Sequence, residues 1–394
     1  MIEGLRNRYI RPLVIRKKTT DDLLGYSLIF NCLSYGVKAI ASWMNLQQLS
    51  ALLSIVVFAI WIVFLVLHVA FRHRIIIKIV KWEFFYCLFL LINYLCFPHT
   101  QIYYYEYFVY LRQIIIVFIP CAAALSIETD FSRTWSVLRR YAVFCSLFMY
   151  IAIIMGYIRY WGYQTFGVYF MPLPIIMFYS ALKNNKLFDK VLLIINTILV
   201  FLGGRQSVFV VTITFLVLFY FIKRPSPTKN VLFVFSGITI VFLYIILSES
   251  IFQALSDLGI YSRTLESINS GTFFSFDTRF SIYYKSLNII KTNGNRISGL
   301  FADRLYLREM AGWITYAHNF FLEVLIDYGI IFGTIIISIF LLKISITLFK
   351  VKEERKILFF VIFSLGFIRL LVSNSFAIAG TFYLIFGFIF NSNN

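Results

Sequence analysis

Long apolar runs separated by short polar segments make up most of this 394-residue chain. A helix needs about 20 apolar residues to cross the hydrocarbon core of a bilayer. The runs are apolar at successive positions, whereas strands of a membrane barrel would alternate apolar and polar residues. The pattern predicts an all-α polytopic membrane protein, with residues 1–394 forming a single integral membrane domain. About twelve spans are expected, and the third and seventh are the shortest: 23–42, 51–71, 83–98, 110–126, 141–158, 166–182, 189–204, 206–222, 231–248, 319–342, 357–373 and 375–391.

One long polar segment, residues 249–318, separates the ninth run from the tenth. Within it, apolar side chains recur at the spacing of one helical face between residues 279 and 291. A helix this short does not span, so we expect an amphipathic helix lying on the outer membrane surface. Asn293, Gly294 and Gly299 then end it, and an irregular segment is expected to lead back to the bilayer at His318. The predicted apolar face consists of Phe280, Tyr283, Tyr284, Leu287 and Ile290.

Composition agrees with a membrane location. The chain is 60% hydrophobic and 20% aromatic, with a mean hydropathy of +0.83, whereas soluble domains are nearer half apolar. Its Met171–Pro174 stretch also carries two prolines, which predict a break or a kink in the sixth span.

The net charge of +18 reflects topology. Most of the 36 Lys and Arg fall in every second inter-span segment, and basic residues concentrate on the cytosolic side of membrane proteins. Both termini are therefore expected in the cytosol, with the 249–318 loop on the other side, and nucleic-acid binding is not expected. The basic segments are 1–22, 72–82, 127–140, 183–190, 223–230 and 343–356.

Metal and nucleotide chemistry find no support in the residue spacing. The five cysteines all fall within apolar spans and form neither a metal-ligand pattern nor a disulfide framework. No His/Asp/Glu group has metal-ligand spacing along the chain, and no Gly-x-x-x-x-Gly-Lys-Ser/Thr loop occurs. We therefore expect neither a metal nor another cofactor.

Arg205 is the first candidate for binding an anion. It follows Gly203 and Gly204 at the outer junction of the seventh and eighth runs. The glycines let the backbone bend, and a guanidinium suits bidentate contact with phosphate. The alternative is an arginine that only reaches the membrane interface.

The long loop supplies further cations between residues 279 and 309. Arginines flanking an amphipathic helix favour a pocket for a diphosphate, with Arg279, Arg304 and Arg308 as the candidates. A basic surface that attracts anionic lipid headgroups is the alternative. Spacing alone leaves open which of Arg296, Arg304 and Arg308 would contact a ligand.

His318 is the candidate catalytic residue, because it starts the tenth run. A histidine titrates near pH 6.5, so it can take a proton from a hydroxyl at neutral pH. The helix dipole at this position favours the neutral form that a base requires. The alternative is an interfacial histidine with no catalytic role. Glu323, Asp303 and Asn319 are secondary candidates.

The segment from His318 to Gly333 carries a recognisable pattern. It has a His-Asn pair, apolar residues, an acid, and two glycines four residues apart, Gly329 and Gly333. It resembles the membrane-embedded O-antigen polymerase and O-antigen ligase family of bacterial envelopes. The Gly-Gly-Arg205 turn and Arg279 at the start of an amphipathic helix agree with it. Members often carry a glycine-rich stretch in the region of residues 292–312, where this chain has only Gly294, Gly299 and Gly312.

The resemblance implies a GT-C-like, metal-independent inverting glycosyltransferase in the bacterial inner membrane, with a periplasmic catalytic loop at 249–318. Its donor would be an oligosaccharide on undecaprenyl diphosphate, held by the arginines, and His318 would deprotonate the acceptor. We favour a repeat-unit polymerase over an O-antigen ligase acting on lipid A-core, which shares these features. A flippase of lipid-linked oligosaccharides is the third hypothesis. Expected partners are a flippase and chain-length regulator proteins.

Overall fold

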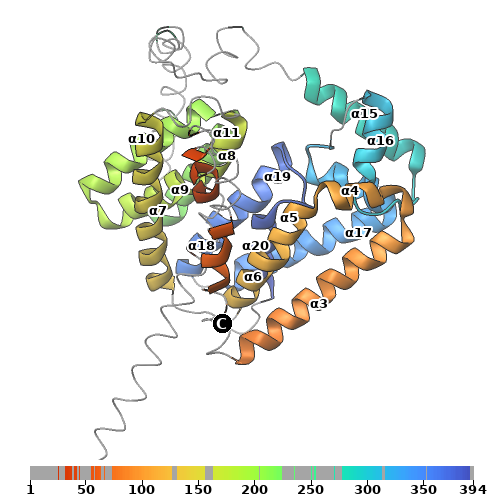
Figure 1. The fold of residues 1–394 in the computed structure, drawn as a ribbon, viewed down its shortest axis with the longest axis horizontal. Coiled ribbons are helices and arrows are strands. Elements are labelled where there is room, and N and C mark those ends of the chain that lie inside the picture. Colours follow the sequence, from red (N-terminus) through yellow and green to blue (C-terminus); the bar gives the residue numbers. More distant parts are fainter. Residues whose placement is uncertain are drawn as a thin grey trace, which may run out of the picture. The chain divides into compact units, whose positions relative to one another are not determined.

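A computed structural model describes residues 73–126, 131–155, 163–203, 205–223, 277–312, 316–351 and 353–390, together with short stretches and single residues elsewhere (Figure 1). The elements among these residues are helices, with no strand in the described part of the chain. Two compact units divide the chain. The first comprises residues 1–20, 65–130 and 276–394, and the second comprises residues 21–64 and 131–275.

The described helices include four that are long and apolar enough to cross a membrane: Phe108–Leu125, Phe131–Ile154, Phe166–Asn184 and Phe320–Lys350. Ser207–Ile222 and Gly380–Ile389 are shorter apolar helices. The protein is therefore a helical membrane protein, as its pattern predicts. The expected runs 23–42, 51–71 and 231–248 lie largely outside the described residues, and the twelve-span layout stays a prediction.

The second unit contains α7 (Phe131–Ile154), α8 (Tyr163–Phe170), α9 (Pro172–Asn184), α10 (Leu187–Gly203) and α11 (Arg205–Lys223). Pro172 occupies the first turn of α9, where its missing N–H is tolerated, and Met171 keeps helical dihedrals. The two prolines thus kink the sixth run without ending it. The expected boundary of the fifth run was wrong, because α7 begins at Phe131 and takes in part of the predicted 127–140 loop.

The first unit begins with α3 (His73–Cys96), the 3₁₀ helix η1 (Pro98–Thr100), α4 (Gln101–Glu106) and α5 (Phe108–Gln113). A π-helical turn, η2 (Ile114–Phe118), joins α5 to α6 (Ile119–Leu125). The third run was expected to begin near residue 83. Instead α3 starts ten residues earlier, so Lys78 and Lys81 belong to the helix and not to the loop before it.

The amphipathic helix of the long loop is confirmed as a helix, α15 (Asp277–Asn293), and it ends before Gly294 at φ +56°. The predicted apolar face is divided, however. Ile282, Ile289 and Ile290 pack in a core with residues of α16 and α17, while Phe280, Tyr284 and Leu287 are exposed. The segment expected to be irregular is a second helix, α16 (Ala302–Ala311), which lies beside α15 (Figure 1).

The tenth run forms α17 (Phe320–Lys350), which is broken at Gly329 with φ +74° and ψ 169°. At this break the backbone of the 294–299 loop approaches so closely that a Cβ on Gly329 would lie 2.7 Å from the carbonyl carbon of Asn295. The Ile330 N–H donates to the Gly294 carbonyl at 3.0 Å. Glycine is required here because the φ and the space both exclude a larger residue.

The last helices are α18 (Glu353–Phe363), the π-helical η3 (Ser364–Ile368), α19 (Arg369–Val372) and α20 (Gly380–Ile389). The twelfth run was expected to begin at residue 375, and this is wrong. Residues 373–379 are not helical, because polar groups of this segment bond to a carboxylate on α17. Helix resumes only at Gly380.

Candidate active site

The loop that joins α15 to α16 is held in place by the C-terminal end of α3 and the residues that follow. The His99 imidazole Nε2 lies 2.9 Å from the Ser298 carbonyl. The Leu300 N–H donates to the Asn93 side-chain oxygen at 3.0 Å. Next in the chain, Phe301 adopts a left-handed φ of +72° and stacks on Tyr107 at 5.5 Å. His99 and Asn93, to which the sequence assigned no role, therefore position the start of α16.

Four charged side chains gather where α16 meets α17, and we call them the Arg304 cluster: Asp303, Arg304, Glu323 and Asp327. All four are fully buried. Arg304 Nη1 lies 2.7 Å from Asp303 Oδ1 and 3.4 Å from Glu323 Oε1. The guanidinium also lies over the rings of Phe301, Tyr107 and Tyr316, at 4.8, 4.9 and 5.8 Å from their centroids.

Three backbone N–H groups and one hydroxyl also donate to the carboxylates. Asp303 Oδ2 accepts from the Ala317 N–H at 3.0 Å, and Asp327 Oδ1 accepts from the Asp303 N–H at 3.0 Å. Glu323 accepts from the Ser375 hydroxyl and, at 3.1 Å, from the Phe376 N–H. The cluster thus connects α16, α17 and the 373–379 segment. Through the Ala317 N–H it also contacts the residue that directly precedes His318.

Acidic side chains outnumber basic side chains in the Arg304 cluster. Three carboxylates surround one guanidinium. Among the described residues, the buried Nε and Nη2 of Arg304 and Oδ2 of Asp327 have no hydrogen-bond partner. Burial acts to lower the pKa of Arg304, but the neighbouring charges of Asp303 and Glu323 outweigh it and raise that pKa. Arg304 therefore stays charged, and the cluster keeps unused bonding capacity.

His318 lies immediately before α17 in a left-handed conformation, φ +54°, which is uncommon for a residue other than glycine. Asn319 caps the helix, because its side-chain oxygen accepts from the Phe321 and Leu322 N–H groups at 3.0 and 3.4 Å. The His318 ring packs on Tyr316 with centroids 4.0 Å apart. The cap and the ring contact hold the imidazole in a defined orientation.

The His318 imidazole is in its neutral form at neutral pH. Burial, and then the positive charges of Arg279 and Arg304, lower its pKa to about 4. Its buried Nδ1 has no hydrogen-bond partner among the residues that the structure describes. A neutral imidazole has a nitrogen lone pair that can accept a proton, although the lowered pKa makes it a weaker base than a free imidazole.

The arginines expected to hold a diphosphate differ in their surroundings. Arg308 on α16 is exposed and Arg279 on α15 is partly exposed, so both are open to a ligand. Arg304 is enclosed by the Arg304 cluster, and this geometry does not present it to a diphosphate. Arg205 begins α11 in the second unit, and its side chain lies outside what the structure describes.

Sequence spacing missed the grouping of acids. Asp303, Glu323 and Asp327 each offer a carboxylate oxygen, and these oxygens lie within 4.8 Å of one another. The spacing along the chain gave no sign of this group, because folding brings Asp303 to two acids of another helix. Oxygen ligands of this kind suit Mg²⁺ or Ca²⁺, but Arg304 already bonds two of the carboxylates. Glu323 and Asp327, four residues apart within an apolar run, were the signal available in the sequence.

Comparisons of the chain with protein-family models, with curated proteins and with solved structures found no match.

Proposed function

We propose that this protein is a polymerase of lipid-linked repeat units, a glycosyltransferase of the bacterial inner membrane that uses an undecaprenyl diphosphate-linked glycan as donor. The proposal starts from the resemblance of the 318–333 segment to O-antigen polymerases and ligases. The observation that carries it further is the His318 imidazole, held neutral and oriented, with an unengaged nitrogen beside two arginines.

In the proposed reaction the His318 imidazole takes the proton from an acceptor sugar hydroxyl. The acceptor oxygen then attacks the anomeric carbon of the donor from the face opposite the diphosphate. The bond between the anomeric carbon and the diphosphate oxygen breaks, and the electron pair leaves with undecaprenyl diphosphate. Attack from the opposite face inverts the anomeric centre. The proton on His318 passes to solvent or to the departing diphosphate.

Charge develops on the leaving diphosphate, and fixed cations at that position lower the barrier. Arg279 is suited to this role because its charge already acts on His318 and its side chain is not fully buried. Arg308 and Arg205 are further candidates. Arg304 acts as a positioning residue instead, since its partner Asp303 bonds the Ala317 N–H next to His318.

The exposed side of α15 supports a substrate that arrives in the membrane. Phe280, Tyr284 and Leu287 are exposed at i, i+4 and i+7, which places them on one stripe of the helix. A short helix with such a stripe lies at the headgroup boundary of a bilayer. In the proposal α15 rests on the periplasmic leaflet and presents Arg279 to the diphosphate of the lipid-linked donor.

Two alternatives stay open. An O-antigen ligase would use the same donor and the same residues, and would transfer the glycan to lipid A-core. A flippase of lipid-linked oligosaccharides would need charged groups within the membrane. Glu323 and Asp327, two buried acids in the apolar helix α17, favour this alternative, because buried acids in apolar spans often mark proton or ion pathways.

The test is a transfer assay in membranes with a lipid diphosphate-linked repeat unit. We expect His318→Gln to reduce the rate by about 10²–10⁴-fold, since glutamine donates hydrogen bonds but does not accept this proton. Arg279→Lys should also lose most activity, because lysine lacks the bidentate fork. Lys291→Gln, an exposed change on the same helix, is the matched control and should keep wild-type activity.

Three results would decide against the proposal. Wild-type polymer from the His318→Gln variant at normal protein level would remove His318 as the base. Loss of activity in EDTA, restored by a divalent cation, would contradict a metal-independent reaction. Transfer only to lipid A-core, or movement of the glycolipid across vesicles without bond formation, would replace the polymerase with the ligase or the flippase.

A further inference from the structure

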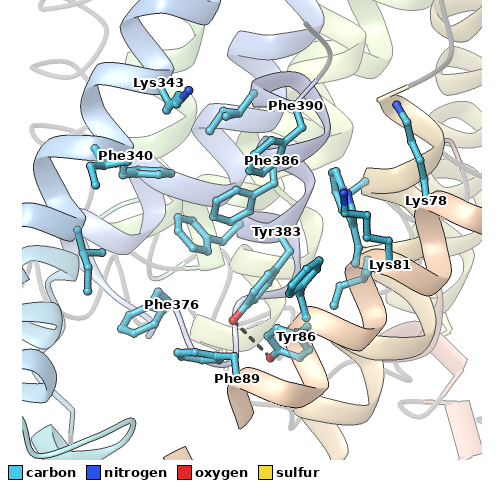
Figure 2. A pocket seen from close by; sticks show the side chains of 18 of the residues that line it. Lys78, Lys81, Tyr86, Phe89, Phe340, Lys343, Phe376, Tyr383, Phe386 and Phe390 are labelled. Atoms are coloured by element: carbon cyan, nitrogen blue, oxygen red, sulfur yellow. Dashed lines mark hydrogen bonds between the residues drawn. The ribbon is translucent and has the colours of Figure 1, made fainter. Parts of the chain in front are cut away.

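The first unit contains an elongated cavity of about 1170 Å³ that the proposed reaction does not use. It lies between α3, α6, α17, α20 and the segment before α20, and its wall is almost entirely apolar and aromatic (Figure 2). Small-molecule pockets are typically about 300–1,000 Å³, so this one is large. Its size and apolar wall suit a chain-like hydrophobic ligand.

The positively charged residues of this wall are concentrated at one end. Lys78, Lys81 and Lys343 line the cavity there, whereas Phe89 and Phe376 lie toward its other end (Figure 2). Lys81 and Lys343 are exposed, and within the described part of the chain neither forms an ion pair. Lys78 donates to the Ser126 hydroxyl at 3.2 Å. The lysines form a cationic end suited to a phosphate.

The length of the cavity matches one leaflet. Along α3, Lys78 and Phe89 both line it, and the rise of about 1.5 Å per helical residue places them about 16 Å apart. The hydrocarbon core of a bilayer is about 30 Å thick, so this distance is close to half of it. Trp82 lies beside the cationic end and packs edge-on against Phe390 at 5.5 Å. Tryptophan at that depth is typical of the headgroup boundary.

We propose that this cavity is a binding site for an anionic phospholipid. The phosphate of the headgroup lies among Lys78, Lys81 and Lys343, and an acyl chain extends past Tyr86 and Tyr383 towards Phe89 and Phe376. The Tyr86 hydroxyl donates to the Tyr383 hydroxyl at 3.4 Å, so these two hydroxyls bond to each other beside the acyl chain. Basic pockets between membrane helices are known to hold anionic headgroups.

The lysine end of this cavity is separate from the proposed donor site, although its other end reaches Phe320 at the start of α17. His318 precedes Phe320 at the start of α17, whereas Lys343 lies near the end of that helix. Likewise Lys78 lies near the start of α3, and His99, which contacts the loop before α16, follows its end. A lipid whose phosphate lies on the lysines therefore has its headgroup at the opposite end of these helices from His318.

The experiment measures the unfolding temperature of the purified full chain in a neutral detergent. Phosphatidylglycerol, phosphatidylcholine with the same acyl chains, and inorganic phosphate are added in turn. We expect phosphatidylglycerol to raise the unfolding temperature by several degrees through preferential binding to the folded state. Phosphatidylcholine and inorganic phosphate should give much smaller shifts.

Matched variants separate the cavity from general surface charge. Lys81→Gln combined with Lys343→Gln should abolish the shift, whereas Lys350→Gln, two turns further along α17 and not part of the wall, should keep it. Ile339→Trp, which adds bulk to an exposed position in the wall, should abolish it while the lipid-free protein unfolds near the wild-type temperature.

Several results would overturn the proposal. Equal shifts with both lipids would mean that the headgroup charge is not recognised, and an equal shift with inorganic phosphate would mean that the acyl chain is not. Loss of the shift in the Lys350→Gln variant would assign the effect to surface charge. Transfer activity is measured on the same variants. Loss of the lipid shift with normal transfer supports a separate site, whereas failure of the glycosyl-transfer proposal leaves the lipid result unaffected.

Discussion

Two ionic groups among the described residues, one in each unit, differ in how their charges are paired. In the second unit, Asp189 on α10 is fully buried and receives Arg139 Nε at 3.1 and 3.0 Å and Nη2 at 2.7 Å. The Ser180 hydroxyl donates to the same carboxylate at 2.6 Å. One acid thus meets one base in a bidentate arrangement, and the hydrogen-bonding capacity of Asp189 is largely used.

The Arg304 cluster in the first unit has three acids for one base and retains buried nitrogen and oxygen atoms without partners. A buried unsatisfied polar group costs about 1–3 kcal/mol, so such groups persist where the surrounding fold or the function requires them. The Arg139–Asp189 pair is explained by packing alone. The Arg304 cluster, next to His318, is the group in which we expect changes to affect activity as well as stability.

The largest expected effect is at Arg304. Arg304→Met leaves three buried carboxylates without their guanidinium, and removing one partner of a buried ion pair costs about 3–5 kcal/mol. We expect a large fall in unfolding temperature and in the amount of protein in membranes. Adding Asp303→Asn and Glu323→Gln to this variant removes two of the stranded charges and should restore part of the stability. An unfolding temperature equal to wild type in Arg304→Met would show that the cluster is not held by charge.

A smaller change in stability is expected when one aspartate of each ionic group is replaced by asparagine, and its sign should differ between the Arg139–Asp189 pair and the Arg304 cluster. Asp189→Asn weakens the charge-assisted bonds to Arg139 and should cost about 1.5–3 kcal/mol. Asp327→Asn keeps the oxygen that accepts from the Asp303 N–H and removes an acidic group beside two other acids. We expect its unfolding temperature to equal or exceed that of wild type. If both substitutions destabilise equally, the contrast between a satisfied and an unsatisfied group is wrong.

A third effect, which appears only on acidification, is a pH dependence at His318. The pKa of the imidazole is lowered in the folded protein from about 6.5 to about 4, so between these values the unfolded chain binds more protons. Stability attributable to this residue is therefore complete above about pH 6.5 and falls as the pH approaches 4. Unfolding temperatures of wild type and His318→Gln, measured from pH 7 to 4, should diverge in this window as the wild type loses relative stability. Parallel curves would show that the imidazole is not held neutral.

Much of the fold follows from the order of apolar and polar residues. The run from 189 to 204 becomes α10 and the run from 206 to 222 becomes α11 with nearly the expected limits, because an apolar segment of this length satisfies its backbone in lipid only as a helix. The helix expected over residues 279–291 is also correct, although its predicted apolar face is divided. The predicted helix boundaries were less accurate where charged residues flank an apolar run. Lys78 and Lys81 were expected before the third helix but lie within α3, because lysine is a good helix former.

The candidate site was predicted only in part. His318, Asn319 and Glu323 were identified because they begin an apolar run, and local sequence is enough to place a helix start and its cap. The divided face of α15 was not foreseen, since which side of a helix is buried depends on the neighbour that covers it. The burial of Arg304 was missed for a related reason. An arginine in a polar segment is expected to be exposed to solvent. Arg304 is buried because two acids and three aromatic rings surround it in the folded protein.

The sequence by itself determined that this is a helical membrane protein, that a helix follows Arg279 and that another begins after His318, because these depend on periodicity and on residues close together in the chain. Tertiary structure alone decided the rest. Helix α17 is interrupted at Gly329, where the 294–299 loop packs against it. Residues 373–379 are not helical, and two of their polar groups donate to Glu323. Folding also places Asp303 beside Glu323 and Asp327. These features depend on close approach between segments far apart in the chain, and the free energy of bringing buried charges together depends on distances that no local pattern encodes.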